Sequence, residues 1–344
     1  MYDLMNRTVL IIGPDYFNFP KAAQASFKRE GWNTVTDLYD TPVHPYTFLM
    51  KCLYKLSHDK ERIRKKSSNK YNLHVIEVFK QTQPDLVFIM NGEILSDSTL
   101  DLMRQNSKVV VWLFDNRDRL PDSLSHIDHS DMLFCYEQDD VDWYAKQGKK
   151  AWFLPQACDT ETYHPLDIRK DIDILFIGNL YTSPKRMKTM QAVVEHFSSD
   201  YNIKVYGRYK PWFKGFFTWL TREHREIYKN KMIAPGRVNE LYNHAKVVLN
   251  IHQELQKDGA NPRTFEIPAS GAWQICDYNP YIEKLFNPGE IGIYHNQDEL
   301  FDLIEKGLKQ DMSANAQRAR ETVLEHHTFD VRIQYILKLL NLND

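Results

Sequence analysis

The chain has 344 residues, 42% of them hydrophobic and 13% aromatic, and its formal net charge at pH 7 is −2. This composition is that of a globular protein and excludes global disorder. The lack of a basic excess argues against a dedicated nucleic-acid binder. Because single hydrophobic cores stop growing near roughly 250–300 residues, the length favours two domains.

Neither the cysteines nor the start of the chain indicates secretion or membrane insertion. Cys52, Cys135, Cys158 and Cys276 have no paired spacing, so neither a zinc ribbon nor a disulfide framework is expected. The opening residues, MYDLMNRTVLIIGPDY, lack the features of a signal peptide. No stretch approaches the ~18 apolar residues of a spanning helix. We therefore expect a cytoplasmic protein, with peripheral contact at the cytoplasmic membrane as an additional option.

Short apolar runs alternate with helical patterns along the first half of the chain, which is typical of a parallel sheet with crossover helices. Most of these runs are almost entirely apolar, as expected of strands covered on both faces. Helices are expected at Lys21–Glu30 and Asn72–Gln81. The expected strands are Thr8–Ile12, Thr34–Asp37, Leu86–Met90, Val109–Phe114, Met132–Tyr136 and Trp152–Leu154.

A second alternation follows residues 155–171, a stretch that breaks both periodicities and that we interpret as an interdomain linker. It opens with IDILFIGN, residues 172–179. Further strands are expected at Ile203–Tyr206, Val247–Ile251, Ala272–Cys276 and Ile291–Tyr294, and helices at Lys185–His196, Arg237–His244, Arg263–Ser270, Gln297–Lys306 and Phe329–Leu342. The prediction is an α/β protein with two doubly wound domains, 1–165 and 166–328, and a C-terminal helix, 329–344, that returns to the first domain. Ligands of such sheets bind beyond the carboxyl ends of the strands.

The segment from 258 to 278, DGANPRTFEIPASGAWQICDY, carries the most specific pattern of chemical groups. A loop with Gly259 and Asn261 leads into a helix that has Arg263 and Glu266 near its start. A helix N-terminus suits a diphosphate, and Arg263 can add a charge-assisted contact. Glu266 can accept hydrogen bonds from the two hydroxyls of a ribose. The alternative interpretation is purely structural: Glu266 is a carboxylate that the helix macrodipole favours near the N-terminus, and Arg263 has no binding role.

This segment resembles the donor-site signature of GT-B glycosyltransferases, in which two acidic residues stand eight positions apart ahead of small residues and a glycine. Asp258 and Glu266 have this spacing, although the family usually has glutamate at the first position. The pattern from IDILFIGN through NPRTFEIPASG to EHHTFDVRIQYIL is similar to the glycosyltransferases grouped with bacterial spore maturation proteins. It also resembles, more distantly, the phage enzyme that glucosylates modified cytosine in DNA. The match covers the C-terminal half well and the N-terminal half in outline.

The resemblance implies a GT-B fold, with two Rossmann-like domains facing a central cleft, and a nucleotide-diphosphate sugar as donor, a UDP-sugar being favoured. It implies that Glu266 binds the ribose, Arg263 the diphosphate and Asp258 a hydroxyl of the donor sugar. No tightly bound cofactor is expected. Asp171 and Asp173 have DxD form but enter a buried strand, so no divalent metal is implied.

Other residues match the parts of the family's site that hold the phosphates and the base. Gly178 and Asn179 match the family's glycine turn that faces the phosphates. Lys185 and Arg186 match its second basic phosphate contact. The stretch 236–238, with Arg237 and Val238, matches the backbone that holds the base. The alternative is that Lys185 and Arg186 are solvent-exposed charged residues of a helix and bind no ligand.

Asp115 is the candidate catalytic residue of the first domain. It lies just past an apolar strand in VVVWLFDNRDRLPDS, and the phage enzyme has a similar run in which the aspartate resembles a general base. A carboxylate there could take the proton from an acceptor hydroxyl. The alternative is an Asx turn that caps the strand. Asp115 as base implies inversion of the anomeric centre, whereas the Asp258/Glu266 pair is commoner in retaining enzymes.

Two basic stretches are candidates for contact with an acceptor or a membrane. Residues 55–70, KLSHDKERIRKKSSNK, are strongly cationic, and residues 209–231 interleave aromatic with basic side chains. Either would suit an anionic membrane surface or a negatively charged acceptor, and the alternative is a surface loop and helix without a partner. The aromatic density of 209–231 favours peripheral membrane contact there, against packing on the second domain's own sheet.

The sequence therefore predicts a glycosyltransferase that acts on a saccharide or lipid-linked acceptor, in the assembly of a surface polysaccharide or other glycan. A nucleic acid is not the favoured partner. Three alternatives remain: a nucleotide-sugar epimerase, a phage-type DNA-base glucosyltransferase, and a GT-B protein that binds a nucleotide or glycan without turnover.

Overall fold

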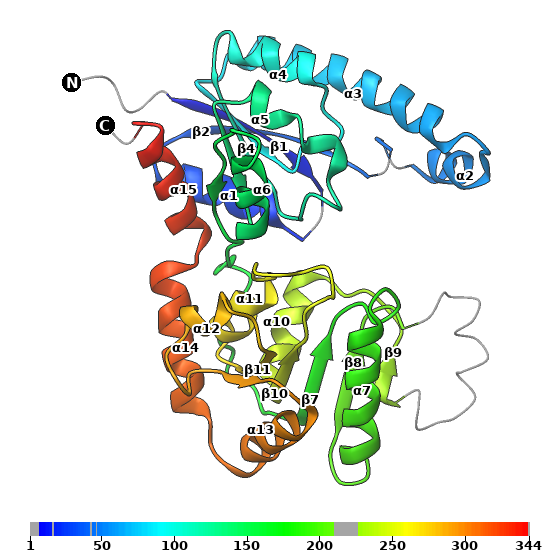
Figure 1. Cartoon of the computed structure of the whole chain (residues 1–344), viewed down its shortest axis with the longest axis vertical. Coiled ribbons are helices and arrows are strands. Elements are labelled where there is room, and N and C mark those ends of the chain that lie inside the picture. Colours follow the sequence, from blue (N-terminus) through cyan, green and yellow to red (C-terminus); the bar gives the residue numbers. More distant parts are fainter. Residues whose placement is uncertain (1–6, 16, 42, 46, 210–225, 343–344) are drawn as a thin grey trace. The chain divides into compact units, whose positions relative to one another are not determined.

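The computed structural model describes residues 7–15, 17–41, 43–45, 47–209 and 226–342, which form two compact units (Figure 1). Unit 1 contains the described residues up to Pro155 together with those from Phe329 onward, and unit 2 runs from Gln156 to Thr328. Unit 2 thus begins inside the stretch that we interpreted as a linker. No helix within the described ranges is long and apolar enough to cross a membrane.

Unit 1 is a parallel six-stranded sheet with helices packed against it. The strands follow the order β2-β1-β3-β4-β5-β6, and the order reverses between β1 and β3. The strands are β1 (Thr8–Pro14), β2 (Asn33–Tyr39), β3 (Leu86–Met90), β4 (Lys108–Trp112), β5 (Met132–Cys135) and β6 (Trp152–Phe153). The helices are α1 (Phe19–Arg29), α2 (Phe48–Leu56), α3 (Lys60–Thr82), α4 (Asp97–Arg104), α5 (His126–His129), α6 (Gln138–Ala145) and α15 (Phe329–Leu339), with a 3₁₀ turn η2 at Pro121–Ser123.

Helix α3 is longer than predicted, and helix α15 joins unit 1 from the far end of the chain. The predicted helix Asn72–Gln81 is only the last part of α3, which starts at Lys60 because the Asp59 carboxylate accepts a hydrogen bond from the N–H of Arg62 (2.9 Å). The last helix, α15, belongs to unit 1. Its Phe329 ring lies 5.9 Å from that of Trp112, and Arg332 donates to the carbonyl of Pro155 (3.1 Å).

Unit 2 is a second parallel six-stranded sheet, in the order β12-β11-β10-β7-β8-β9. Its strands are β7 (Ile172–Ile177), β8 (Ile203–Tyr206), β9 (Tyr228–Lys229), β10 (Ala245–Asn250), β11 (Trp273–Asp277) and β12 (Gly292–Tyr294). Its helices are α7 (Pro184–Phe197), α10 (Pro235–His244), α11 (Arg263–Ala269), α12 (Ile282–Leu285), α13 (Gln297–Lys309) and α14 (Ser313–His326). Counted within the unit, this is the Rossmann order, which reverses between β7 and β10. The predicted α/β fold with two doubly wound domains is confirmed.

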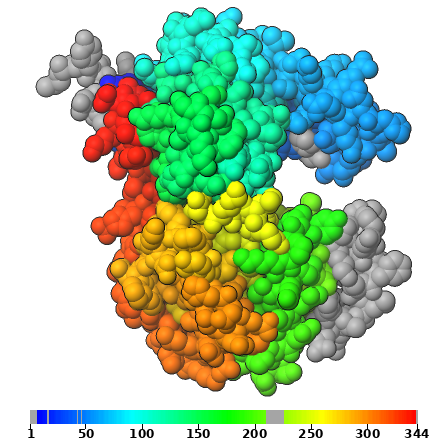
Figure 2. Space-filling model, viewed as in Figure 1, coloured from blue at the N-terminus to red at the C-terminus, as the bar shows by residue number. Residues whose placement is uncertain are grey.

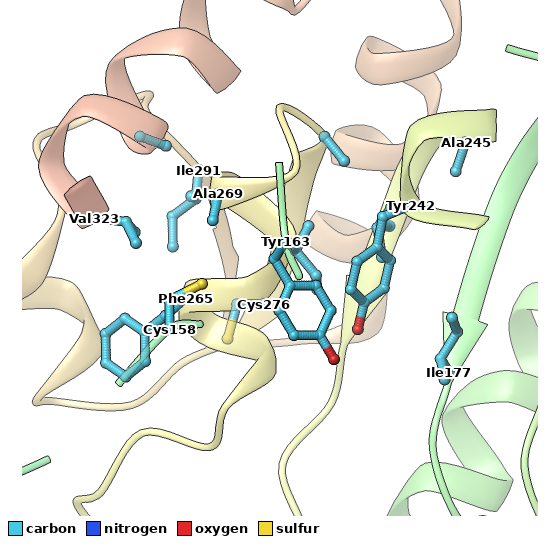
Figure 3. Packing of buried hydrophobic residues seen from close by; sticks show 14 of the residues in the cluster. Cys158, Tyr163, Ile177, Tyr242, Ala245, Phe265, Ala269, Cys276, Ile291 and Val323 are labelled. Carbon is cyan, nitrogen blue, oxygen red and sulfur yellow. The ribbon is translucent and has the colours of Figure 1, made fainter. Parts of the chain in front are cut away.

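The cores explain why the strands are continuous apolar runs. In unit 2 the side chains of β7 and β10 point alternately into two clusters, one under α10, α11 and α14 and the other under α7 and α13. Figure 3 shows the first cluster, where Tyr163 from the start of the unit lies beside Tyr242 of α10. Because both faces of the sheet are covered, polar side chains that carry chemistry are left to the strand ends.

Candidate functional site

The candidate site of unit 2 is formed by the loops that follow β7, β10 and β11. These three strands are neighbours in the sheet, and the strand order reverses between β7 and β10. In open α/β sheets the crevice outside the carboxyl ends at such a reversal is where ligands bind. The residues predicted from the motifs, 178–186 and 258–266, lie in or directly after these loops.

The turn after β7 packs closely against Gly207, which follows the neighbouring strand β8. The N–H of Gly178 donates to the carbonyl of Tyr206 (2.8 Å). Gly207, directly after β8, has φ +124°, and a Cβ at that position would lie 2.0 Å from the Gly178 carbonyl oxygen. Only glycine allows both this backbone conformation and this approach. The backbone of Gly178 and Asn179 is therefore held at the carboxyl edge of the sheet.

The N-terminus of α7 already has an anionic partner. Ser183 caps the helix and donates from its hydroxyl to Glu254 (2.7 Å), and the N–H of Lys185 donates to the other carboxylate oxygen of Glu254 (2.7 Å). Burial raises the pKa of Glu254, but these hydrogen bonds outweigh it and the pKa is lowered overall. A carboxylate from the loop after β10 thus occupies a position that suits an anion.

Lys185 is aimed at the sheet edge by a buried acid. Its ammonium group pairs with Asp277, the last residue of β11, and the other oxygen of Asp277 accepts from the N–H of His252 (2.9 Å) and lies 2.8 Å from its Nδ1. Burial raises the pKa of Asp277, but the hydrogen bond and charge of His252 and the charge of Lys185 outweigh it and lower the pKa. The Lys185 side chain stays 42% exposed, so it can also contact a ligand.

The same acid belongs to a compact set of potential metal ligands, formed by His252, Cys276 and Asp277. Both oxygens of Asp277 have hydrogen-bond donors, from His252 and Lys185. Nδ1 of His252 is engaged by Asp277, and Cys276 is fully buried. The set is therefore an ion-pair network in this conformation, and we assign no metal to it.

Arg186 has a different position from Lys185, and contact of both residues with phosphate stays a prediction. It is buried, and its Nε donates to the carbonyl of Ile251 (2.6 Å). Neighbouring residues of a helix point about 100° apart, so the two side chains cannot share one direction. In this conformation Arg186 ties α7 to the loop after β10.

A buried amide network holds the loop between β10 and α11. Asn261 donates to the side-chain oxygen of Asn250 (2.9 Å) and accepts from the N–H of Thr264 (3.2 Å). Asn279 donates to the carbonyl of Gly259 (3.1 Å). Gly259 and Asn261 thus position the loop through bonds inside the protein. Asp258, in the same loop, is partly exposed.

Glu266 is the most unusual group of unit 2. It is buried, and burial raises the pKa of its carboxyl to about 7, although the charge of Arg263 and a hydrogen bond with Tyr163 lower it. The ring of Tyr242 lies 6.2 Å from that of Tyr163, and the Tyr242 hydroxyl is buried without a hydrogen-bond partner among the described residues. Figure 3 shows both hydroxyls at the same side of the cluster. A carboxyl that ionises near neutrality is thus flanked by one cation and two phenols.

The stretch 236–238 at the start of α10 divides into exposed and buried parts. The Arg237 side chain is 54% exposed and pairs with Glu240. Val238 is buried in the core, and its N–H already donates to the carbonyl of Ala234 (3.0 Å). Of the predicted backbone contacts, only those at Gly236 and Arg237 belong to the first helical turn, whose N–H groups have no intrahelical acceptor.

In unit 1, Asp115 has a second carboxyl group nearby. Asp115 follows β4 and lies 3.2 Å from the guanidinium of Arg119; burial raises the pKa of Asp115 more than Arg119 lowers it. Glu93 follows the neighbouring strand β3 and accepts a hydrogen bond from the Tyr39 hydroxyl (2.6 Å). Burial raises the pKa of Glu93, and the charge of Asp115 raises it further. The negative charges of Asp115 and Glu93 therefore interact at the carboxyl edge of this sheet.

Several of these groups were missed by sequence reasoning. Glu93 carried a usable signal, since Asn-Gly-Glu comes directly after an apolar strand, as Asp115 does. Tyr163, His252 and Asp277 carried none, because they come from a presumed linker, a loop and a strand end that meet only in the fold. The predicted membrane segment 209–231 lies mostly outside the described residues, which omit 210–225.

Comparisons with known proteins agree with this architecture. Residues 186–338 match a family model described as "Glycosyl transferase-like". Sucrose-phosphate synthase from Thermosynechococcus elongatus is similar with a TM-score of 0.69 and 10% identity, over 98% of this chain and 100% of that one. The catalytic domain of starch synthase IV from Arabidopsis thaliana, bound to ADP and acarbose, gives 0.71 and 8%, over 98% and 99%. Anabaena HepE in complex with UDP and glucose gives 0.62 and 11%, over 97% and 99%. No curated protein matches the chain, and at these identities the structural likeness establishes the fold.

Proposed function

We propose that this chain, a glycosyltransferase with the GT-B fold, transfers a sugar from a UDP-sugar to a saccharide or lipid-linked acceptor in the assembly of a surface polysaccharide or other glycan. The observation that carries the proposal is the buried Glu266, whose pKa is raised to about 7, beside Arg263 at the edge where the strand order reverses. Titratable groups with shifted pKa values in such places are candidate ligand-binding groups.

The donor is proposed to be a nucleoside-diphosphate sugar. The HepE structures hold UDP with glucose or UDP-glucose, and that of starch synthase IV holds ADP. Ionised Glu266 would accept hydrogen bonds from the two ribose hydroxyls, and the free hydroxyl of Tyr242 can complete that contact. The exposed backbone at Gly236 and Arg237 would hold the base. This set of contacts favours a nucleotide over a free sugar.

The diphosphate would lie between Arg263 and Lys185, next to the backbone of Gly178 and Asn179. Lys185 offers a point charge that Asp277 keeps oriented, and Arg263 offers a planar fork that can bind two oxygens at once. Asp258 would accept a hydrogen bond from a hydroxyl of the donor sugar. Arg186 is proposed to act as a positioning residue, because its guanidinium holds the Ile251 carbonyl.

In the proposed transfer, the acceptor hydroxyl oxygen forms a bond to the anomeric carbon of the donor sugar while the bond from that carbon to the diphosphate oxygen breaks. The acceptor proton passes to the Asp115 carboxylate, and UDP leaves with the electron pair of the broken bond. Burial raises the pKa of Asp115, which brings a carboxylate closer to the pH at which a general base works best. Inversion follows if this is the base. Retention would instead favour the Asp258/Glu266 pair, as in the enzymes where that spacing is common.

We also propose that the chain belongs to the spore-maturation group, that it contacts a membrane peripherally through 209–231 and that it requires no metal. An epimerase would convert the donor sugar at C2, a phage-type enzyme would modify DNA, and a protein without turnover would release no UDP. Product analysis with a nucleotide-sugar separates these alternatives.

Calorimetry with UDP tests the donor site. Glu266→Ala and Arg263→Ala should each weaken UDP binding by roughly ten- to a hundredfold, because a hydrogen bond to a charged group contributes about 1.5–3 kcal/mol. Glu283→Ala, an exposed glutamate of α12, serves as the matched control and should bind UDP normally. Wild-type affinity in both site variants, with circular dichroism unchanged, would refute the assignment.

A further inference from the structure

Helix α2 of unit 1 has an apolar face that the described residues of its own unit leave exposed. None of its nine residues is buried, and four large apolar side chains are strongly exposed. The exposed fractions are 84% for Phe48, 68% for Leu49, 49% for Leu53 and 80% for Leu56. Leu49, Leu53 and Leu56 have the i, i+4, i+7 spacing of one helix face, and Phe48 extends it. A contiguous apolar patch on an exposed surface usually marks an interaction site.

Local contacts hold this helix with its apolar face outward. Thr47 caps it by accepting a hydrogen bond from the N–H of Met50 (3.3 Å). Tyr54, two positions before Leu56 and therefore on the opposite side of the helix, has the ammonium of Lys60 5.9 Å from its ring centre. Lys60 is the first residue of α3, so the Tyr54 side faces α3. Figure 1 shows α2 beside the start of α3, and Figure 2 shows this blue region at the edge of unit 1.

The surroundings of the apolar face are basic. Residues 47–70 contain eight lysines and arginines against two acidic residues, a formal charge of +6 in a chain whose total is −2. Helix α2 itself has Lys51 and Lys55 and no acidic residue. On α3, Lys65, Lys66 and Lys70 are exposed. An apolar stripe bordered by lysines complements a surface that is both apolar and anionic.

We propose that residues 47–70 bind the surface of an anionic lipid bilayer. The side chains of Phe48, Leu49, Leu53 and Leu56 enter the boundary between headgroups and acyl chains, and the lysines of α2 and α3 meet lipid phosphates. A protein partner would suit the apolar stripe alone, but the charge of +6 around it favours an extended anionic surface. The proposal is independent of the donor site, because it concerns unit 1 only.

The test is co-flotation of the full chain with vesicles at low salt. Wild-type protein should float with vesicles of phosphatidylcholine and phosphatidylglycerol and remain behind with phosphatidylcholine alone. Leu49→Ser with Leu56→Ser should weaken binding by about tenfold for each leucine. Vesicle binding should weaken by about fivefold for each of the substitutions Lys55→Gln, Lys65→Gln and Lys66→Gln. Added salt should also weaken vesicle binding. Leu339→Ser, a less exposed leucine of α15, is the matched control and should float like wild type.

Because the substituted side chains are exposed, the variants should keep the wild-type circular dichroism and UDP affinity. Wild-type protein that stays behind with anionic vesicles would overturn the proposal. So would unchanged flotation of the Leu49→Ser/Leu56→Ser variant, which would place membrane contact elsewhere, for instance in 209–231. Sedimentation that shows a dimer only with intact leucines, without vesicle binding, would identify the face as a contact between copies and overturn it as well.

Discussion

The pH dependence of UDP binding follows from the position of Glu266. Burial raises the pKa of this carboxyl to about 7, so it is mostly neutral at pH 6 and mostly ionised at pH 8. If only the carboxylate accepts both ribose hydroxyls, affinity should rise with pH and level off above the pKa. The ionised fraction grows from about one tenth at pH 6 to about nine tenths at pH 8, which predicts roughly a tenfold gain in affinity.

Calorimetry from pH 5.5 to 8.5 with wild type and Glu266→Gln measures this effect. The amide cannot ionise, so its affinity profile retains only the titration of UDP and of other groups, and the ratio of the two affinities isolates Glu266. That ratio should change about tenfold between pH 6 and pH 8. A ratio that is constant with pH would refute the reasoning, either because Glu266 does not contact the ribose or because its carboxyl is already ionised at pH 6. If the protein binds adenosine diphosphate instead of uridine diphosphate, with the same pH dependence, only the proposed identity of the base would be wrong.

Two further predictions concern catalysis and folding. Asp115→Asn should keep UDP affinity and lower turnover by about 10²–10⁴-fold, as measured by UDP release with a suitable acceptor. If Glu93→Gln abolishes turnover and Asp115→Asn does not, Glu93 is the base. Gly207→Ala should lower the free energy of unfolding by about 1–3 kcal/mol in urea, because its Cβ meets the Gly178 carbonyl. Gly31→Ala has positive φ but open space around it, so a loss as large as that of Gly207→Ala would contradict this explanation.

The sequence by itself determined the two sheets. Strands covered on both faces must be almost wholly apolar, so Leu86–Met90 is predicted with its observed bounds. Ile203–Tyr206 is also predicted with its observed bounds, from alternating apolar and partly exposed residues. Helix α14 was missed because it buries only small or short side chains, Ala316, Ala319 and Val323, which leave a weak periodic pattern. β9 has two residues, too few to show alternation.

The sequence also placed the donor motifs after the strands of unit 2, because chemistry in a covered sheet is confined to strand ends. Only the tertiary structure separated Lys185 from Arg186, since one helical step turns one side chain toward the site and the other toward a backbone carbonyl. Only the fold brought Tyr163 to Glu266 and Asp277 to Lys185, across 103 and 92 positions of the chain. A raised carboxyl pKa depends on that burial and on those neighbours, and neither is local in the sequence.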